Sequence, residues 1–225
     1  MSKGFSIAID GPVAAGKGTI APALAKRLNG FYLYTGAMYR CVALYCLRNN
    51  IDLDDQAKVE TILPEINIDF THNEIILNNE DVTQEIKKED VAAGSARVSA
   101  YQKVREELVA KQKDIANKAL EQGIAVVAEG RDTATKVLPE ADLKVFLTAS
   151  PNVRAQRRLK QIEESGQKAD FNKVLEEVEI RDSRDRERKI DPLVENPQDL
   201  GYFVLDDSNM SEEETINSII DQIKS

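Results

Sequence analysis

The residues best suited to chemistry form a glycine-rich run directly after a short apolar segment. The run consists of Gly11, Pro12, Val13, Ala14, Ala15, Gly16, Lys17, Gly18 and Thr19. Glycines let a chain wrap closely round an anion, so that backbone N–H groups and the start of a following helix point at phosphate oxygens. Lys17 would add a mobile cation for a transferred phosphoryl group. The run predicts a loop that binds nucleotide phosphates; the alternative is a glycine-rich turn with a lysine on the surface.

A second group, E-G-R-D at residues 129–132, directly follows an apolar segment that we expect to be a strand. Open α/β sheets bind ligands at the carboxyl ends of their strands. At that edge Arg131 could hold a second phosphate, and Asp132 could accept a hydrogen bond from a second substrate. The alternative is that Asp132 caps a helix while Arg131 lies in solvent.

An arginine-rich segment late in the chain continues an apolar helix face. Val174 and Val178 begin a line at helical spacing, and Arg181, Asp185 and Arg188 extend it. These three charged side chains should therefore point toward the protein body or a cleft. The other cations of the segment lie off the line: Arg184, Arg186 and Lys189. The alternative is an ion pair within the helix, between Arg181 and Asp185, that binds no ligand.

Two further sets of arginines have unusual surroundings. Arg105 lies inside an apolar helix face, where a cation needs an anion or a buried acceptor. Arg154, Arg157 and Arg158 share one helix face just after a plausible helix start at Pro151. They would form either a mobile lid over phosphates or a surface face, and the presence of a phosphate loop favours the lid.

Short apolar segments are expected to form the strands that position these groups: 5–10, 31–34, 124–129, 143–148 and 202–206. Longer amphipathic segments separate them, with long helices expected over about 97–121 and about 170–190. This alternation predicts an α/β fold with a parallel sheet wrapped by helices. Residues 66–83 depart from it, because alternating apolar positions beside polar turns predict a small inserted antiparallel β subdomain.

The composition excludes several classes of protein. The 225 residues carry 30 Lys and Arg against 39 Asp and Glu, and this net charge of −9 argues against binding to nucleic acid polymers. One histidine, His72, and two cysteines, Cys41 and Cys46, cannot supply a zinc centre or a Ser-His-Asp triad. No segment approaches the roughly 18 uninterrupted apolar residues of a membrane span. We therefore expect a cytoplasmic protein with buried thiols.

Taken together, these residues resemble the bacterial cytidylate kinase family over nearly the whole chain. The spelling G-x-x-x-x-G-K-G-T is similar to that of nucleoside monophosphate kinases. The other matching pieces are YTGAMYR (34–40), LNNEDVTQEI (77–86), VREEL (104–108), EGRDTATKVLPEADLKVFLTAS (129–150), RAQRR (154–158) and RDSRDRERKIDPL (181–193).

The resemblance implies one P-loop domain over residues 1–225. Its parts would be a core (about 1–34, 116–149 and 190–225), a monophosphate-binding region (about 35–115, with the β insert at about 66–83) and a short helical lid (about 150–168). The implied reaction is direct in-line phosphorylation of CMP and dCMP by ATP, with Mg²⁺ bound to the ATP. A monomer is expected, with no membrane and no nucleic acid polymer as partner.

The resemblance also implies roles for individual residues. Lys17 and the loop backbone would hold the ATP phosphates, with Arg157 or a neighbour closing from the lid. The acceptor phosphate would be held by Arg40, Arg131 and Arg188. Arg181 and Asp185 would contact the pentose, and Thr35, Arg105 and Asp132 the cytosine. The catalytic groups would be Lys17, Arg131, Asp132 and Arg188, and no side chain is assigned as a metal ligand.

Three positions depart from the family pattern. Tyr34 stands where Asp is usual, Ala96 where a base-contacting Ser is usual, and Ala134 where Gly is usual. These changes bear on base and sugar selectivity and leave the phosphoryl chemistry untouched. The alternatives are a kinase of the same fold for another acceptor, such as UMP or AMP, a nucleotide-binding regulatory module without turnover, and an acidic scaffold whose basic helix binds partners.

Overall fold

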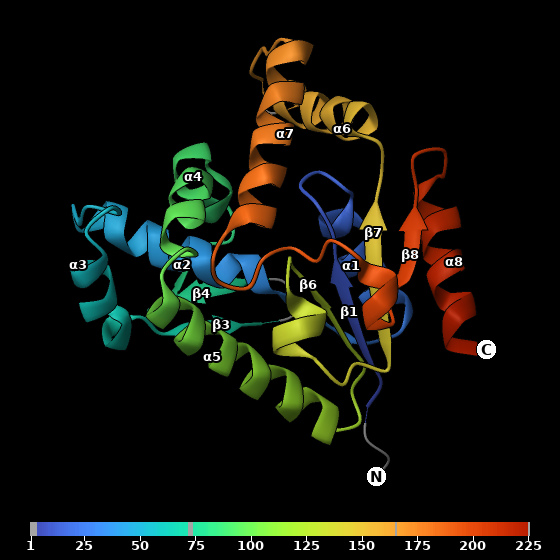
Figure 1. The fold of residues 1–225 in the computed structure, drawn as a ribbon. Coiled ribbons are helices and arrows are strands. Elements are labelled where there is room, and N and C mark those ends of the chain that lie inside the picture. The colour runs from blue at the N-terminus through green and yellow to red at the C-terminus, as the bar shows by residue number, and fades with distance from the viewer. Residues whose placement is uncertain (1–3, 72–73, 165, 225) are drawn as a thin grey trace. The chain divides into compact units, whose positions relative to one another are not determined.

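The computed structural model describes residues 4–71, 74–164 and 166–224, so His72 lies outside the described residues. The chain divides into two compact units (Figure 1). Unit 1 combines residues 1–33 with 116–225, and unit 2 consists of residues 34–115. Each is described below by itself. Among the described residues, no helix combines the length and apolar character needed to cross a membrane.

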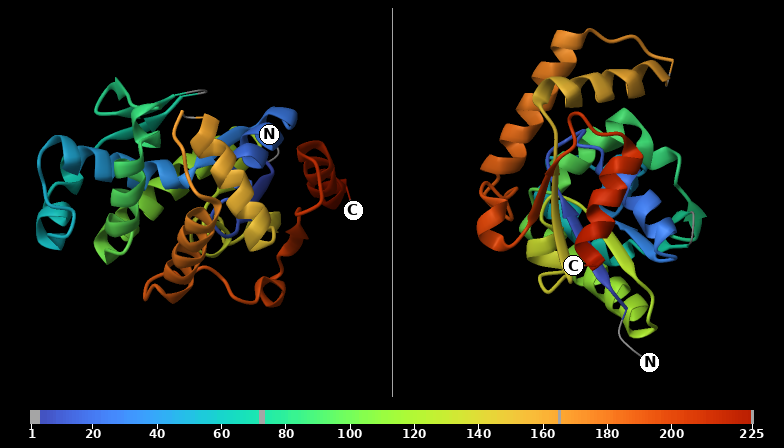
Figure 2. Two further views of the ribbon diagram at one scale, coloured as in Figure 1. Left: turned by 90° about the horizontal axis from the view of Figure 1, so that it is seen from above. Right: turned by 90° about the vertical axis from the view of Figure 1, so that its right-hand side faces the viewer.

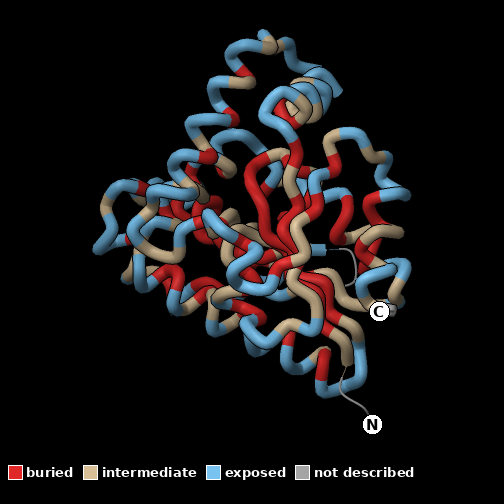
Figure 3. The backbone as a smooth tube through the Cα atoms, turned by 45° about the vertical axis from the view of Figure 1, so that its right-hand side comes forward, coloured by how far each residue is buried: buried red, intermediate tan, exposed pale blue. Residues whose placement is uncertain are grey.

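Unit 1 is built on a parallel five-stranded sheet with the strand order β2-β6-β1-β7-β8. The strands are β1 (Ser6–Asp10), β2 (Phe31–Tyr34), β6 (Val126–Glu129), β7 (Leu143–Thr148) and β8 (Phe203–Asp206). Each begins and ends within two residues of the segment expected from the sequence, and the predicted α/β class is confirmed. Every residue of β1 and β6 is buried, which explains why both read as continuous apolar runs rather than alternating ones (Figure 3).

Helices α1 (Lys17–Arg27) and α8 (Glu212–Lys224) pack against this sheet. Unit 1 also contains α6 (Pro151–Glu164), α7 (Phe171–Glu187), a π-helical turn η3 (Thr133–Val137), a 3₁₀ turn η4 (Pro197–Leu200) and the end of α5 (Gln102–Glu121). The faces of α1 and α8 carry Leu24 and Ile219, which are buried in one apolar cluster with Ile9 and Leu147 of the sheet. This cluster fixes the start of α1, and with it the glycine-rich loop, against the sheet.

The helices α6 and α7 pack against each other beyond the carboxyl end of β7 (Figures 1 and 2). Most of their surface is exposed (Figure 3). Asp170 caps α7, because its Oδ1 accepts hydrogen bonds from the N–H groups of Asn172 and Lys173. The sequence predicted this helix over about 170–190, but it ends at Glu187, so Arg188 is its C-cap and has an extended backbone.

Unit 2 contains helices and a small sheet. Its elements are α2 (Thr35–Arg48), α3 (Gln56–Thr61), the 3₁₀ turns η1 (Leu63–Glu65) and η2 (Glu85–Lys87), α4 (Glu89–Val98), most of α5, and strands β3 (Ile68–Phe70), β4 (Ile75–Leu77) and β5 (Glu80–Asp81). The order β3-β4-β5 with antiparallel pairing confirms the predicted β insert. The helices α2 and α4 pack closely at Gly94, where a Cβ would come 3.1 Å from the Cβ of Ala43.

The single helix expected over about 97–121 is wrong at its start. Helix α4 ends at Val98, and α5 begins only at Gln102. Tyr101 lies in the turn between them and donates a hydrogen bond from its hydroxyl to the carbonyl oxygen of Leu53, at 2.8 Å. Both helices carry buried residues at helical spacing, and this spacing continues across the turn. The sequence pattern therefore predicts one helix where the structure has two.

Candidate active site

The glycine-rich run forms a tight loop between β1 and α1. Helix α1 begins at Lys17, and Gly16 before it has a φ of 91°, a left-handed conformation that suits glycine. At Gly11 the backbone passes so close to β7 that a Cβ would come 2.0 Å from the carbonyl oxygen of Leu147. The strand, loop and helix therefore have the order that a phosphate-binding loop requires.

Lys17 is buried rather than on the surface, with an exposed fraction of 5%. Its Nζ donates hydrogen bonds of 2.7 Å to the carbonyl oxygens of Gly11 and Pro12. Burial, followed by repulsion from Arg131, lowers the pKa of Lys17 to about 7, although the carboxylates of Glu129 and Asp10 oppose the change. Glu129, the first residue of the E-G-R-D segment, lies beside this loop, with its Oε1 3.7 Å from where a Cβ at Gly18 would be. The alternative of a surface lysine is excluded by the burial of Lys17.

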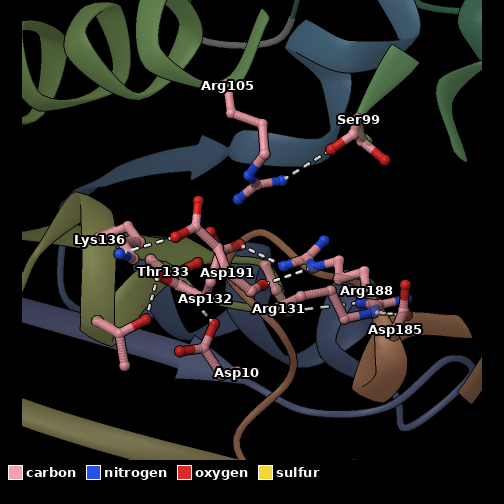
Figure 4. A network of polar contacts seen from close by, with 12 residues as sticks. Asp10, Ser99, Arg105, Arg131, Asp132, Thr133, Lys136, Asp185, Arg188 and Asp191 are labelled. Atoms are coloured by element: carbon pink, nitrogen blue, oxygen red, sulfur yellow. Dashed lines mark hydrogen bonds and ion pairs between the residues drawn. The ribbon is translucent and has the colours of Figure 1, made fainter. Parts of the chain in front are cut away.

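Two residues that follow β6, Arg131 and Asp132, form ion pairs with Asp185 in the last turn of α7 and with its C-cap Arg188 (Figure 4). The Nε of Arg131 lies 2.6 Å from Asp185 Oδ2, and the Nη2 of Arg188 lies 3.4 Å from Asp132 Oδ1. Arg131 and Arg188, with the nearby Lys17 cation, lower the pKa of Asp185 against the opposing effect of burial, which is the largest single influence. Arg131 is thus paired rather than in solvent, and the Asp132 side chain makes no cap hydrogen bond.

Burial along α7 follows the predicted line. Arg181 and Asp185 are half-buried, whereas Arg184 and Arg186 are exposed. Asp185 Oδ2 accepts a hydrogen bond of 2.6 Å from the Nε of Arg131 in the E-G-R-D segment, so this helix face meets another element rather than only itself. The same face also carries Asp182, a buried carboxylate that the sequence line did not include.

Asp10 is a second residue that sequence reasoning missed. It is fully buried at the end of β1, and its carboxylate accepts hydrogen bonds from the N–H of Thr133 at 2.7 Å and of Ala134 at 2.9 Å. The hydroxyl of Tyr202 donates to it at 2.8 Å. These bonds hold the segment that follows Asp132 (Figure 4). The available signal was a carboxylate inside an apolar strand, which requires several partners when buried.

A cavity of about 350 Å³ opens beside the loop in unit 1. Its lining includes Gly16, Thr19, Arg157, Asp207 and Met210. Arg157 lies 2.9 Å from Asp207 Oδ1 through its Nη1 and donates from Nη2 to the Asp207 carbonyl oxygen at 3.1 Å. Burial raises the pKa of Asp207, with Arg157 opposing the shift. Arg157 therefore stands at the wall of a cavity that adjoins the loop.

Comparison with known proteins identifies the family of this chain. The sequence model of the cytidylate kinase family matches residues 7–225. The chain belongs to the cytidylate kinase family. It is 40% identical to the cytidylate kinase of Neisseria gonorrhoeae over 98% of both chains. It is 41% identical to that of Clostridium botulinum strain Langeland over 98% of both, and 41% identical to that of Caldanaerobacter subterraneus over 97% of this chain and 94% of the other.

Solved structures with low sequence identity share the fold. An uncharacterized protein from Eubacterium ventriosum matches with a TM-score of 0.54 at 15% identity, covering 98% of this chain and 99% of that chain. A gluconokinase from Sinorhizobium meliloti matches with a TM-score of 0.50 at 13% identity, covering 100% and 94%. The resemblance to the cytidylate kinase family that the motifs indicated is therefore confirmed, together with the fold.

The remaining residues that the cytidylate kinase pattern singles out lie in unit 2. Thr35 is the buried first residue of α2, and its carbonyl oxygen accepts from Gln112 Nε2 at 3.3 Å. Arg40 donates to the carbonyl oxygen of Ile86 at 2.7 Å. The guanidinium of Arg105 is buried over the ring of Tyr39, at 5.5 Å from its centroid. Its Nη1 also donates to the carbonyl oxygen of Ser99 at 3.3 Å, which is the buried acceptor that the sequence indicated Arg105 would need (Figure 4).

The departures from the cytidylate kinase pattern have local consequences. The ring of Tyr34 lies so close to Gly36 that a Cβ there would come 2.8 Å from Tyr34 Cε2. Ala96 is half-buried on α4, and the hydroxyl of its neighbour Ser95 donates to the Ala92 carbonyl oxygen at 2.8 Å. The N–H of Ala134 is bound by Asp10, so this position keeps a backbone role without glycine.

Proposed function

We propose that this chain transfers the terminal phosphoryl group of ATP to CMP and dCMP, giving ADP with CDP or dCDP. The observation that carries this proposal is that the E-G-R-D segment lies beside the phosphate loop, because Glu129 Oε1 is 3.7 Å from where a Cβ at Gly18 would be. Arg131 of the same segment is held by Asp185. Lys17, which would bind the phosphates of the donor, and Arg131, which would bind the phosphate of the acceptor, then belong to one site. Membership of the cytidylate kinase family supports CMP and dCMP as the acceptors.

The donor nucleotide would occupy the loop and the cavity beside it. The backbone N–H groups of residues 11–19 and Lys17 would hold the phosphates of ATP. The adjoining cavity of about 350 Å³ would take the adenosine, with Arg157 at its wall. The Nη2 of Arg157, which donates to the neutral carbonyl oxygen of Asp207, would turn to phosphate oxygens, which are stronger partners for a guanidinium. Its Nη1 would keep the ion pair with the Asp207 carboxylate.

The acceptor would bind the charged residues around the E-G-R-D segment. Arg131 and Arg188 would hold its phosphate, while Arg181 and Asp185 would contact the pentose. Asp132 would accept a hydrogen bond from the amino group of cytosine, which uracil lacks. From unit 2 we assign Arg40 to the phosphate and Thr35 and Arg105 to the base.

The chemistry asks little of acid or base catalysis. The phosphate of CMP is ionised near neutral pH, because its second pKa is about 6. One of its oxygens attacks the γ-phosphorus, a new P–O bond forms, and the bond to the β,γ-bridging oxygen breaks with its electron pair left on ADP. Lys17 and Arg131 stabilise the charge that develops on the transferring group, and the rest of the site holds donor and acceptor in line.

Mg²⁺ is implied by the family, and the residues near the loop fit it. This ion takes oxygen ligands, usually one or two carboxylates together with substrate phosphates. The carboxylate of Glu129 lies beside the loop, with its Oε1 3.7 Å from where a Cβ at Gly18 would be. We assign Glu129 to hold the ion together with the ATP phosphates. The bound Mg²⁺ would neutralise part of the phosphate charge.

A coupled assay with ATP and each nucleoside monophosphate in turn tests the proposed function. We expect the highest kcat/KM with CMP and dCMP, because a site that pairs with one hydrogen-bonding pattern leaves buried groups unpaired with another. Faster turnover of UMP or AMP would assign the chain to another acceptor. ATP hydrolysis without stimulation by any acceptor would favour the regulatory module, and unchanged thermal stability with all nucleotides would favour the scaffold.

A further inference from the structure

The backbone of Val13, in the middle of the phosphate loop, is held from both sides by one ion pair. Its N–H donates to Asp182 Oδ1 of α7 at 3.1 Å. Its carbonyl oxygen accepts from Arg154 Nη1 of α6 at 3.0 Å. The same Nη1 lies 2.6 Å from Asp182 Oδ2, so both helices and the loop meet at a single point.

This ion pair is removed from solvent and is well partnered. The side chains of Arg154 and Asp182 are 4% and 6% exposed. Arg154 Nε donates in addition to the carbonyl oxygen of Ala149, just beyond β7, at 3.0 Å. A buried ion pair gives little net stability compared with apolar side chains of similar size, so its presence calls for a reason other than stability.

The loop itself provides that reason. Ala14, next to Val13, has a φ of 57°, a left-handed conformation that costs energy for any residue other than glycine. Such a conformation persists only where the neighbouring structure fixes it. With Val13 held by its N–H and its carbonyl group, the loop keeps this conformation before any phosphate arrives. Groups fixed in advance bind a charged ligand without the cost of reorganising them.

We propose that Arg154 and Asp182 are positioning residues that hold the phosphate loop in its binding conformation and tie it to α6 and α7. The proposal rests on the proposed function only in taking the triphosphate of ATP as the ligand of the loop. The pair touches no substrate, because its hydrogen bonds go to the backbone and to each other. Arg154 is thus bound to the loop backbone and to Asp182. Arg157, one turn further along α6, lines the cavity instead.

Binding of ATP and of inorganic tripolyphosphate, measured by calorimetry with Mg²⁺, tests this role. Two variants remove the pair: Arg154→Met, and the double variant Arg154→Met with Asp182→Leu, which leaves no buried charge behind. Arg184→Met is the matched control, because it removes the same charge from an exposed position of α7, the helix that carries Asp182. We expect both test variants to bind both ligands at least about tenfold more weakly, and the control to bind within about twofold of wild type.

A steady-state measurement separates positioning from a general loss of structure. The KM for ATP should rise in both test variants while the KM for CMP stays within about twofold, at temperatures well below the unfolding midpoint. Wild-type affinity of the double variant for tripolyphosphate would overturn the proposal. Unfolding of the double variant at the assay temperature would also overturn it, because the pair would then serve the fold. If wild type binds tripolyphosphate but phosphorylates no CMP, the proposed function fails while the binding comparison still decides this inference.

Discussion

At the scale of single residues, the site depends on cations whose charges are set by their surroundings. Lys17 is buried beside Arg131, so its charged form is disfavoured until a phosphate supplies opposite charge. Arg131 and Arg188 instead face carboxylates, which hold their guanidinium groups in place. The sequence identified these cations, but Asp10 and Asp182, which fix the backbone around them, were missed because a lone aspartate carries no motif.

The first prediction at this scale concerns turnover by Lys17→Ala. We expect kcat to fall by at least about 100-fold, because this cation meets the charge that develops during transfer. The fold should remain, as judged by circular dichroism. Lys26→Ala, at an exposed position of the same helix, is the control and should keep wild-type activity. Activity of Lys17→Ala within about tenfold of wild type, or roughly 1.4 kcal/mol in the barrier, would contradict the assignment of the loop.

The second prediction uses the pKa of Lys17, which is about 7 in the fold and 10.5 ordinarily. Between these values the unfolded chain binds a proton that the folded chain does not, so the free energy of unfolding rises with pH across this window. Below about pH 7 both states are protonated, and the full cost of the buried charge remains.

Urea unfolding of wild type and Lys17→Met at about pH 7 and about pH 9.5 measures this effect. The variant has no charge to bury, so it should be the more stable protein at the lower pH. Its advantage should shrink at the higher pH by an amount on the order of a few kcal/mol. A difference in unfolding free energy that does not change with pH would show that the pKa of Lys17 is not lowered.

At the scale of elements, α7 links the phosphate loop to the residues that we propose to bind the acceptor. Its Asp182 holds Val13 of the loop, its Asp185 pairs with Arg131, and Arg188 at its C-cap lies near Asp132. Helical spacing alone predicted the inward face correctly up to Asp185. It could not predict that the helix ends at Glu187. Arg188 therefore has an extended backbone, and helical spacing does not determine where its side chain lies.

The third prediction compares four variants of this segment. We expect Arg188→Ala and Arg181→Ala to lower kcat/KM for CMP by at least about 30-fold at saturating ATP, because their side chains lie toward the protein. Arg184→Ala and Arg186→Ala remove the same charge from exposed positions and should stay within about threefold. Equal losses in all four variants would mean that the segment acts through its total charge rather than through two specific side chains.

At the scale of the whole molecule, a protein with a net charge of −9 concentrates cations at one site. Lys17, Arg131, Arg157 and Arg188 all lie in or beside the loop and the E-G-R-D segment of unit 1. These cations can meet the phosphates of a small nucleotide, while the negative overall charge is expected to repel nucleic acid polymers. The acidic composition, which argues against nucleic acid polymers, is therefore compatible with the motifs, which predict binding of nucleotide phosphates.

The fourth prediction is that the protein is a monomer in solution. Among the described residues, the large apolar side chains that are more than a third exposed come from separate elements: Leu47, Ile124, Ile180 and Leu200. Stable interfaces between copies usually need a contiguous apolar patch. Light scattering coupled to gel filtration should give 25.1 kDa. Twice that mass at micromolar concentration would contradict the prediction.

The sequence by itself determined the fold class, the phosphate loop, the E-G-R-D segment and the family. These features depend on local rules, because a strand is a short apolar run, a phosphate loop needs glycines and a lysine in order, and a helix face repeats every 3.6 residues. Only the tertiary structure decided which charges meet, such as Arg131 with Asp185 and Arg154 with Asp182. It also decided the break between α4 and α5. Partners far apart in the chain are brought together by packing of whole elements, and their pairing leaves no periodic trace in the sequence.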